Sequence, residues 1–462
     1  MALFADVEAE PVEEGEEIAG DPEPTNIPAH QRQKPGRKVL SDDLERVEVI
    51  HDLADDEKLC DCGCQLKRMG EETSEQLEVY PKRAFVTRHI RPKYTCPGCE
   101  GVDSNGPTVK IAPVPAQVLP KTIASTTLLA CLLTAKYADG LPYYRQEKQF
   151  QRIGVALSRA TMSHWTIQVA QKCQPILDLL EKEARSGPLI QMDETTFQVL
   201  GEKGRKNTQK SYMWVARGGT RGYPVVLYKY HPSRSGQVAA AWLKDYGGVV
   251  QTDGYAGYGF LDHTEGIIHA GCWAHVRRKF AEVCKLGGKK RTPGLSDQGL
   301  GMINQLYAVE RAIRESRMEA DACKVYRQTH ARPIVEKLQT WLEKHAHRIP
   351  PKGMLGKAIS YALKQFPKLT VYLESGDTPI DNNRVENDIR PFVVGRKNWL
   401  FAGKPEGAHA SALWFSLLET AKANGWDPYT YLVYILSSLP IVKSENDYRA
   451  LLPTRDPMTL KI

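Results

Sequence analysis

The sequence predicts a multidomain α/β protein with a small β-rich, zinc-binding cysteine module ahead of a helical region and a mixed sheet. The chain has 462 residues, which is too long for one ordinary hydrophobic core. Strand-like and helix-like segments alternate between about residues 186 and 290, an order typical of α/β domains. Five of the ten cysteines lie between Cys60 and Cys99. These observations predict several domains built around one α/β core.

The expected organisation divides the chain into eight regions. In chain order these are an acidic disordered tail (1–30), a basic arm and linker (31–55), a zinc-binding domain (56–102), a helical DNA-binding region (118–185), the first part of the α/β core (186–290), a helical insertion (291–375), the second part of the core (376–421) and a C-terminal helical region (422–462). The insertion is predicted because apolar residues recur there at spacings of three and four, without strand patterns.

Charge is distributed unevenly along the chain. Residues 1–30 hold nine acidic residues and neither Lys nor Arg. Since the whole chain has 62 basic and 55 acidic residues, the part after residue 30 carries a net charge of +16. A basic body suits a polyanionic partner, and DNA is the first candidate. In the basic arm, Arg37 and Lys38 are expected to contact DNA, although a solvated linker explains them equally well.

The N-terminus and the apolar runs predict no membrane contact. The first residues are acidic, whereas a secretory signal begins with basic residues. The apolar runs are shorter than the roughly 18–20 residues that span a bilayer. We therefore expect a cytoplasmic, nucleoid-associated protein.

The cysteine cluster predicts a structural zinc ion. Cys96 and Cys99 form a C-x-x-C pair on a Pro-Gly turn, and the segment "CDCGC" supplies three further candidates. Tetrahedral zinc needs four ligands. We favour Cys60, Cys62, Cys96 and Cys99, with Cys64 as the alternative.

The region 118–185 has the outline of a helix-turn-helix motif. A helix is expected to end near Ile153, followed by a turn at Gly154 and a second helix capped by Ser158. Arg159 and His164 near the start of the second helix are then expected to contact DNA bases. A plain helical hairpin is the alternative.

Two carboxylates end up in apolar strands. Asp193 lies in "LIQMDETTF", and Asp253 follows the apolar run in "GVVQTDGY". If the strands are neighbours, the two charges converge and require a cation. Hard oxygen ligands suit Mg²⁺ or Mn²⁺.

Glu386 in "DNNRVENDIRPFVVGRKNWLFAG" is the expected third metal ligand. It lies on a predicted short helix from Asn383 that Pro391 is expected to close. Asn-x-x-Glu also resembles a capping box, which would make Glu386 a purely local residue. The cations that follow, Arg390, Arg396 and Lys397, are expected to hold DNA phosphates.

The segment "GCWAHVRRKF" has two readings. Cys272 and His275 resemble metal ligands but have no partner pair nearby in the sequence. The favoured reading is that Trp273 packs or stacks and His275 contacts substrate. On the same helix, DNA contacts are expected from Arg277, Arg278 and Lys279.

With these residues the sequence resembles the DDE transposases of the insertion-sequence-66 type. The matching stretches include "QMDETTFQVL", "QTDGYAGY", "GCWAHVRRKF" and the long segment around Glu386. The resemblance implies a ribonuclease H-like catalytic core with an Asp193, Asp253 and Glu386 triad. It also implies magnesium-dependent DNA strand cleavage and strand transfer, self-association on DNA and small accessory proteins from the same element.

Two other functions remain open at this stage. One is a ribonuclease H-like nuclease that cuts without joining strands. The other is an inactive, transposase-derived zinc and helix-turn-helix DNA-binding protein. The second predicts a broken triad, whereas all three acids are present in this sequence.

Overall fold

The computed structural model describes residues 48, 83–95, 109–286 and 292–453. Its helices and strands all fall within one compact unit, Tyr80–Ile462. Within the described residues, no helix is both long and apolar enough to cross a membrane. A short antiparallel ribbon of β1 (Lys93–Thr95) and β2 (Val109–Ile111) comes first. The expected zinc ligands Cys60, Cys62, Cys64, Cys96 and Cys99 lie outside the described residues.

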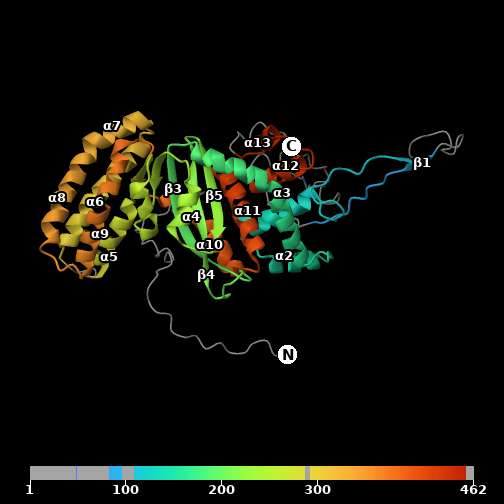
Figure 1. Cartoon of the computed structure of the whole chain (residues 1–462), viewed down its shortest axis with the longest axis horizontal. Helices are drawn as coiled ribbons and strands as arrows, with labels where there is room; N and C mark the ends of the chain where they lie inside the picture. Colours follow the sequence, from blue (N-terminus) through green and yellow to red (C-terminus); the bar gives the residue numbers. More distant parts are fainter. Residues whose placement is uncertain (1–47, 49–82, 96–108, 287–291, 454–462) are drawn as a thin grey trace, which may run out of the picture. The chain divides into compact units, whose positions relative to one another are not determined.

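A mixed sheet forms the centre of this unit, with the strand order β5-β4-β3-β6-β7 (Figure 1). The strands are β3 (Leu189–Val199), β4 (Lys210–Thr220), β5 (Tyr223–His231), β6 (Gly248–Gln251), β7 (Ile267–Ala270) and β8 (Phe401–Ala402). The first three form an antiparallel meander. Strands β6 and β7 continue from β3 in parallel, and β8 pairs with the far end of β3. The predicted α/β class and mixed sheet direction are confirmed.

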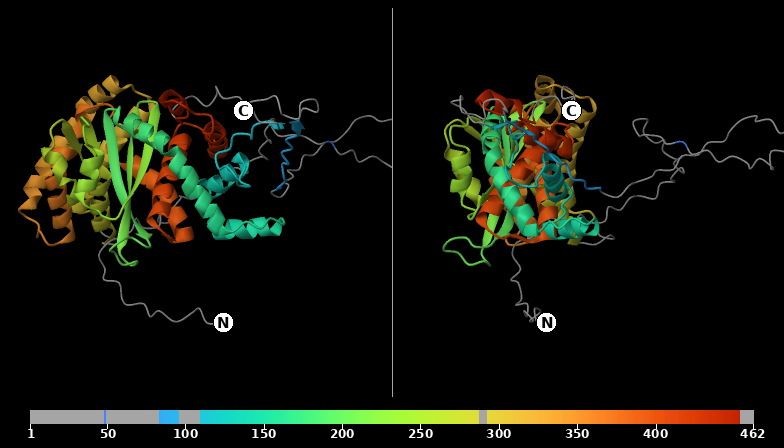
Figure 2. Two further views of the ribbon diagram at one scale, coloured as in Figure 1. Left: turned by 45° about the vertical axis from the view of Figure 1, so that its right-hand side comes forward. Right: turned by 90° about the vertical axis from the view of Figure 1, so that its right-hand side faces the viewer.

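Two helices cover opposite faces of the sheet (Figures 1 and 2). Side chains alternate between the faces of a strand. Met192 therefore lies on the face where α3 (Arg159–Arg185) places Ala184. Phe197 lies on the other face and meets Phe392 of α10 (Asn383–Trp399), with ring centroids 5.0 Å apart. Asp193 has the same parity as Phe197, so it belongs to the face that α10 covers.

The outer edge of β5 is closed by α11 (Pro405–Ala423). Ser416 and Thr420 are four residues apart and so share one face of this helix. The Ser416 hydroxyl accepts from the backbone N–H of Tyr228 at 2.7 Å, and that of Thr420 accepts from Val226 at 2.9 Å. An edge strand otherwise exposes unpaired backbone groups. These two hydroxyls satisfy part of that edge without another strand.

The helical region before the sheet shares its hydrophobic core with the sheet. Its elements are α1 (Thr126–Leu133), the π-helix η1 (Thr134–Ala138), α2 (Tyr143–Arg152) and α3. As expected, a turn with Gly154 at a φ of +78° follows α2, and the Ser158 hydroxyl caps α3 by accepting from Thr161 N–H. Helix α3 has 27 residues. Its later part packs on the sheet, and α12 (Pro428–Ser438) and α13 (Glu445–Ala450) follow at the C-terminal side.

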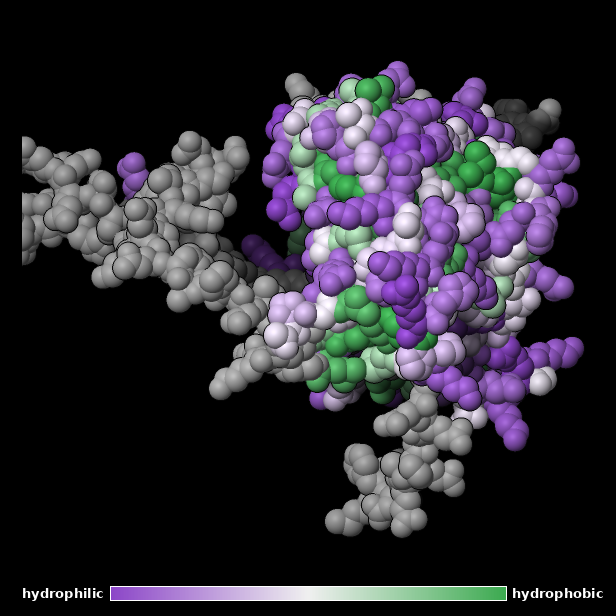
Figure 3. Space-filling view, turned by 90° about the vertical axis from the view of Figure 1, so that its left-hand side faces the viewer, coloured by the Kyte–Doolittle hydropathy of each residue, from purple (hydrophilic) through white to green (hydrophobic). Residues whose placement is uncertain are grey.

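A second hydrophobic cluster holds the helices between β7 and α10. These are α5 (Trp273–Leu286), α6 (Leu295–Glu315), α7 (Ala320–His330), α8 (Arg332–Ala346) and α9 (Met354–Leu369). Trp273 and Phe280 of α5 are buried in this cluster. The outward side of these helices, seen in Figure 3, is mostly hydrophilic with smaller hydrophobic areas. The short helices α4 (Gly236–Trp242), η2 (Ala256–His263) and η3 (Val371–Glu374) complete the unit.

Candidate active site

The first acid, Asp193, sits within β3, paired with Val215 of β4. Its Oδ1 accepts a hydrogen bond of 2.8 Å from the Glu194 backbone N–H. Burial raises the pKa of Asp193 well above its ordinary value, and the negative charges of Glu194, Asp253 and Glu386 raise it further. An ionised Asp193 is therefore unfavourable in this site unless a cation is present.

The second acid, Asp253, follows β6, which is the parallel neighbour of β3. Its Oδ1 accepts from the Tyr255 backbone N–H at 2.9 Å, which holds the turn after the strand. Gly254 leaves room for Tyr361 of α9, because a Cβ at Gly254 would lie 2.5 Å from the Tyr361 hydroxyl oxygen. The turn carrying Asp253 is thus packed against the helical cluster.

The third acid, Glu386, lies in the first turns of α10, which is longer than the expected helix. The helix does not end at Pro391 but continues to Trp399. Phe392, directly after the proline, is fully buried against the sheet. The Tyr228 hydroxyl donates to the carbonyl of Asp388, three residues before Pro391. This packing outweighs the intrinsic penalty of a proline in a helix.

The capping-box reading of Glu386 is wrong. The helix N-cap is Asn382, whose side chain makes no capping hydrogen bond. Glu386 Oε1 is buried and, among the described residues, has no hydrogen-bond partner. The carboxylate is therefore left available for a ligand and is not used at its own helix start.

A buried glutamine pair ties the three acid-bearing segments together. Gln191 and Gln251 are direct neighbours in the β3–β6 register, and each lies two residues before one of the acids. Gln191 Nε2 donates to Gln251 Oε1 at 2.7 Å and to the Asp381 carbonyl at 3.1 Å. Gln251 Nε2 donates to the carbonyls of Gly271 and Pro379 at 3.0 and 2.8 Å. The segment that leads into α10 is thus held against both strands.

Sequence reasoning did not identify this pair, although a signal was present. The motifs "QMD" and "QTD" share the pattern Gln-x-Asp. Residues at this spacing lie on the same face of a strand. A buried glutamine that repeats at the same offset from two acids is a reason to expect a joint structural role.

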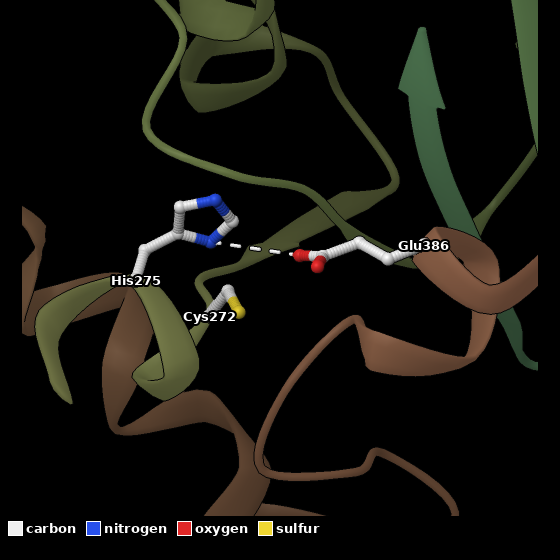
Figure 4. A group of neighbouring side chains, drawn as sticks. All are labelled: Cys272, His275 and Glu386. Carbon is white, nitrogen blue, oxygen red and sulfur yellow. Dashed lines mark ion pairs between the residues drawn. The ribbon is translucent and has the colours of Figure 1, made fainter. Parts of the chain in front are cut away.

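The segment after β7 brings Cys272 and His275 towards Glu386 (Figure 4). His275 Nδ1 lies 3.9 Å from Glu386 Oε1, and Arg278 Nη2 lies 3.7 Å from Oε2. Burial lowers the pKa of His275, against the opposing effect of the Glu386 charge, so the neutral imidazole is favoured. Trp273 packs as expected, with its Nε1 donating to the Leu369 carbonyl at 2.9 Å.

A second charged group forms around Glu194, the residue after Asp193 in β3. Glu194 receives hydrogen bonds from Arg234 Nε at 2.7 Å and from the Tyr258 hydroxyl at 2.5 Å. The Arg234 guanidinium lies over the Tyr255 ring, 3.8 Å from its centroid. Burial raises the pKa of Glu194, and these two donors oppose that rise. Neither Arg234 nor Tyr258 was identified from the sequence, because their partners are distant in the chain.

The other cations expected to contact DNA differ in their surroundings. Arg277 Nε donates to Asn304 Oδ1 at 2.8 Å, and Lys279 lies 4.8 Å from the centre of the Tyr361 ring. Arg396 donates to the Thr195 hydroxyl at 3.2 Å and to Thr196, so it fastens α10 to β3. Each of the three cations thus has a partner within the fold, and its expected DNA contact stays a prediction.

Further expected DNA contacts are exposed or lie elsewhere. Arg390 and Lys397 are exposed on α10, while Arg159 and His164 are exposed at the start of α3. Their roles in DNA binding stay predictions. Arg37 and Lys38 lie outside the described residues.

The residues present fit a hard divalent cation. The charges of Asp253 and Glu386 act on Asp193, which lies partly buried in β3, and Glu386 has a buried oxygen without a hydrogen-bond partner within the described part of the chain. Carboxylate oxygens are the preferred ligands of Mg²⁺ and Mn²⁺. Asp193, Asp253 and Glu386 are the side chains that would hold such an ion.

Comparison with known proteins identifies the family. The family described as "Transposase IS66 family" matches residues 121–410, "zinc-finger binding domain of transposase IS66" matches residues 57–100, and "IS66 C-terminal element" matches residues 416–454. Uncharacterized protein y4jD of Sinorhizobium fredii is 33% identical over 88% of this chain and 80% of its own length. Uncharacterized protein y4qI of the same organism is 33% identical over 90% of this chain and 77% of its own length. The chain therefore belongs to the IS66 family of transposases.

Proposed function

We propose that the chain is a DNA transposase that cleaves and joins DNA strands by divalent-metal-dependent chemistry at Asp193, Asp253 and Glu386. The observation that carries this proposal is the placement of the three acids: Asp193 lies in β3, Asp253 directly follows its parallel neighbour β6, and Glu386 lies on α10, which packs on the same sheet. The three residues are separated by 60 and 133 positions in the sequence. Mutual repulsion of buried acids destabilises a fold unless a cation offsets it, so their convergence favours a metal-dependent function.

The strand order also supports a ribonuclease H-like core. An antiparallel meander continues into parallel strands on the far side of β3. Asp193 lies in β3, and Asp253 follows its parallel neighbour β6. Glu386 lies on α10, which covers the face of the sheet that carries Asp193. The helical cluster lies between the second and third acids in the sequence.

In this proposal each side chain has a distinct task. The three carboxylates would bind Mg²⁺ or Mn²⁺, which supplies a lowered pKa for the attacking water or 3′-hydroxyl and offsets charge on the leaving oxygen. His275 would contact a phosphate oxygen of the strand through its ring N–H. Arg278, 55% exposed at its side chain, would contribute charge attraction to the DNA backbone.

DNA binding would extend beyond these residues. Exposed Arg159 and His164 at the start of α3 suit a helix that meets DNA, and the zinc-finger match at residues 57–100 adds a second binding element. Phosphate contacts release counterions, so affinity should fall steeply with salt. Base contacts by α3 would provide sequence preference.

The decisive experiment is a cleavage and joining assay with the full chain. Purified protein, DNA carrying the element ends and Mg²⁺ are expected to give nicks at the ends and joined products in a target plasmid. Glu386→Gln is expected to lower cleavage by at least about 10²–10³-fold while leaving DNA affinity within a few-fold. Glu406→Gln, an exposed acid in the first turn of α11, is the matched control and should keep full activity.

The same assay separates the competing functions. Cuts without joined products would mean a nuclease without strand transfer. DNA binding with no magnesium-dependent cutting by the wild-type chain would leave a zinc and helix-turn-helix DNA-binding protein.

A further inference from the structure

Cys272, His275 and Glu386 present a sulfur, a nitrogen and an oxygen to the same small space. Their ligand atoms all lie within 4.8 Å of one another. Figure 4 shows the imidazole of His275 facing the carboxylate of Glu386, with the Cys272 sulfur directed between them. Cys272 is buried, and the other two are partly buried. The set differs from the three acids in chemistry, because it adds a thiol and an imidazole.

Several polar atoms around this space lack partners. His275 Nδ1, Glu386 Oε1 and both side-chain polar atoms of Asn382 are buried with no hydrogen bond to any described residue. Asn382 is fully buried. Leaving a buried polar group without a hydrogen bond is unfavourable. The unpaired atoms of His275 and Glu386, which lie beside each other, indicate that a ligand normally satisfies them.

The backbone around Cys272 is firmly held. The Trp273 backbone N–H donates to the Ile380 carbonyl at 3.1 Å, and the Asn382 backbone N–H donates to Cys272 Sγ at 3.5 Å. Both bonds connect the start of α5 to the segment before α10. Burial raises the pKa of the Cys272 thiol to about 12, and the bond from the Asn382 backbone opposes that rise.

We propose that Cys272, His275 and Glu386 form a site for a thiophilic divalent cation of the zinc class, separate from the three-carboxylate site. Zinc bound at about 2.0–2.3 Å places tetrahedral ligand atoms roughly 3.3–3.6 Å apart. The donors already lie within 4.8 Å, so rotation of the His275 and Glu386 side chains closes the site. Binding forms bonds from the metal to sulfur, nitrogen and oxygen, and the thiol proton leaves to water. The remaining position is open to water.

The shared glutamate gives this site a consequence for catalysis, which rests on the proposed function. Glu386 is the only residue common to the two sets. A carboxylate drawn towards a zinc ion beside His275 is withdrawn from Asp193 and Asp253. Zinc-class ions therefore inhibit magnesium-dependent cleavage by capturing the third acid.

Metal binding is tested first, without reference to activity. The full chain is dialysed against buffered zinc, and bound zinc is counted per chain by atomic emission. Wild type is expected to hold one ion more than Cys272→Ser and one more than His275→Ala. Cys323→Ser, which alters a buried thiol on α7, is the matched control and should hold as much zinc as wild type.

Cobalt(II) provides a second readout of the same site. The absorption band of a thiolate–cobalt bond should weaken in Cys272→Ser and remain unchanged in Cys323→Ser. Circular dichroism checks that each variant is folded; if Cys272→Ser is not, His275→Ala decides. Equal zinc content in wild type and the folded site variants would overturn the proposal.

Inhibition is tested second, in the cleavage assay at fixed excess Mg²⁺. Activity with and without zinc is compared within each variant. The zinc concentration for half-inhibition should rise by more than about tenfold in Cys272→Ser, since even an outer-shell partner contributes that much affinity. Equal inhibition of both proteins would overturn the inhibitory role. A wild type that cleaves no DNA at all would count against the proposed function, while the dialysis result would still decide the metal site.

Discussion

Two groups of buried charges in this chain are built in opposite ways. In the helical cluster, Arg327 Nε and Nη2 donate to Glu310 at 2.8 and 2.7 Å. Arg327 Nη1 also donates to the carbonyls of Tyr372, Ser375 and Thr378 at 2.7–3.0 Å. This pair joins α6, α7 and the segment before α10, and its charges are compensated by one another.

The acids at the sheet are compensated only in part, since Arg278 Nη2 lies 3.7 Å from Glu386 Oε2 while no cation pairs with Asp193 among the described residues. The negative charges of Glu194, Asp253 and Glu386 act on Asp193. Glu386 Oε1 has no hydrogen-bond partner in the described residues. A buried ion pair in which every charged group has a partner is explained by a structural role alone. Unsatisfied charges destabilise the free fold and point to a ligand. The contrast separates a structural charge cluster from a functional one within one protein.

The largest effect is expected when one of the mutually repelling carboxylates at the sheet is removed. Asp193→Asn should lower cleavage by at least about 10²–10³-fold and at the same time raise the stability of the metal-free protein at neutral pH. Chemical denaturation and the cleavage assay measure the two changes. A variant that loses both activity and stability would break the comparison.

The pH dependence of the same variant follows from the raised pKa of Asp193. Below the unfolded pKa of about 3.9, the carboxyl is protonated in both states and costs nothing. As pH rises towards the higher folded pKa, the unfolded state loses its proton first, so wild-type stability falls. The stability gap between Asp193→Asn and wild type should therefore widen with rising pH and narrow again when Mg²⁺ is added.

The next effect concerns the satisfied pair. Arg327→Met leaves Glu310 buried without a partner and should cost about 3–5 kcal/mol of unfolding free energy. The double variant Arg327→Met/Glu310→Leu should recover part of that loss. Arg332→Met, whose ion pair with Glu374 is mostly exposed, is the control and should cost less than about 1 kcal/mol. Similar losses for both arginines would contradict the structural role of the Arg327 pair.

The smallest effect is expected from a change in the buried pair of Gln191 and Gln251. Gln251→Leu removes donors to Gly271 and Pro379 and should cost about 1–3 kcal/mol. Because it loosens the segment that positions Glu386, it should also weaken Mg²⁺ affinity in a calorimetric titration. Gln174→Leu, which removes an exposed bond to Asp178, should change neither. Unaltered Mg²⁺ affinity in Gln251→Leu would mean that the pair serves the fold alone.

Local patterns in the sequence predicted a good part of this architecture. Apolar strands followed by an acid indicated Asp193 and Asp253, and the Gly154 turn before Ser158 indicated where α3 begins. These signals are short-range, so neighbouring residues are enough to read them. The helical insertion was recognised for the same reason.

Long-range contacts were not predictable in the same way. The helix around Glu386 runs past Pro391 because the buried Phe392 meets Phe197 of β3, a residue almost 200 positions away. Arg396 was expected to hold a phosphate, and the fold also gives it partners on β3, Thr195 and Thr196, which the sequence did not indicate. A sequence shows the charge of such residues but not the partner that the fold provides.

The central claim, that the three acids hold one divalent cation site, is tested most directly by iron-directed cleavage of the protein itself. Fe²⁺ replaces Mg²⁺, and hydroxyl radicals generated at the ion cut the backbone nearby. The account predicts cuts close to Asp193, Asp253 and Glu386 together, suppressed by excess Mg²⁺ and lost from all three places in Asp193→Asn. Cuts near Glu386 alone, or cuts that persist in that variant, would contradict it.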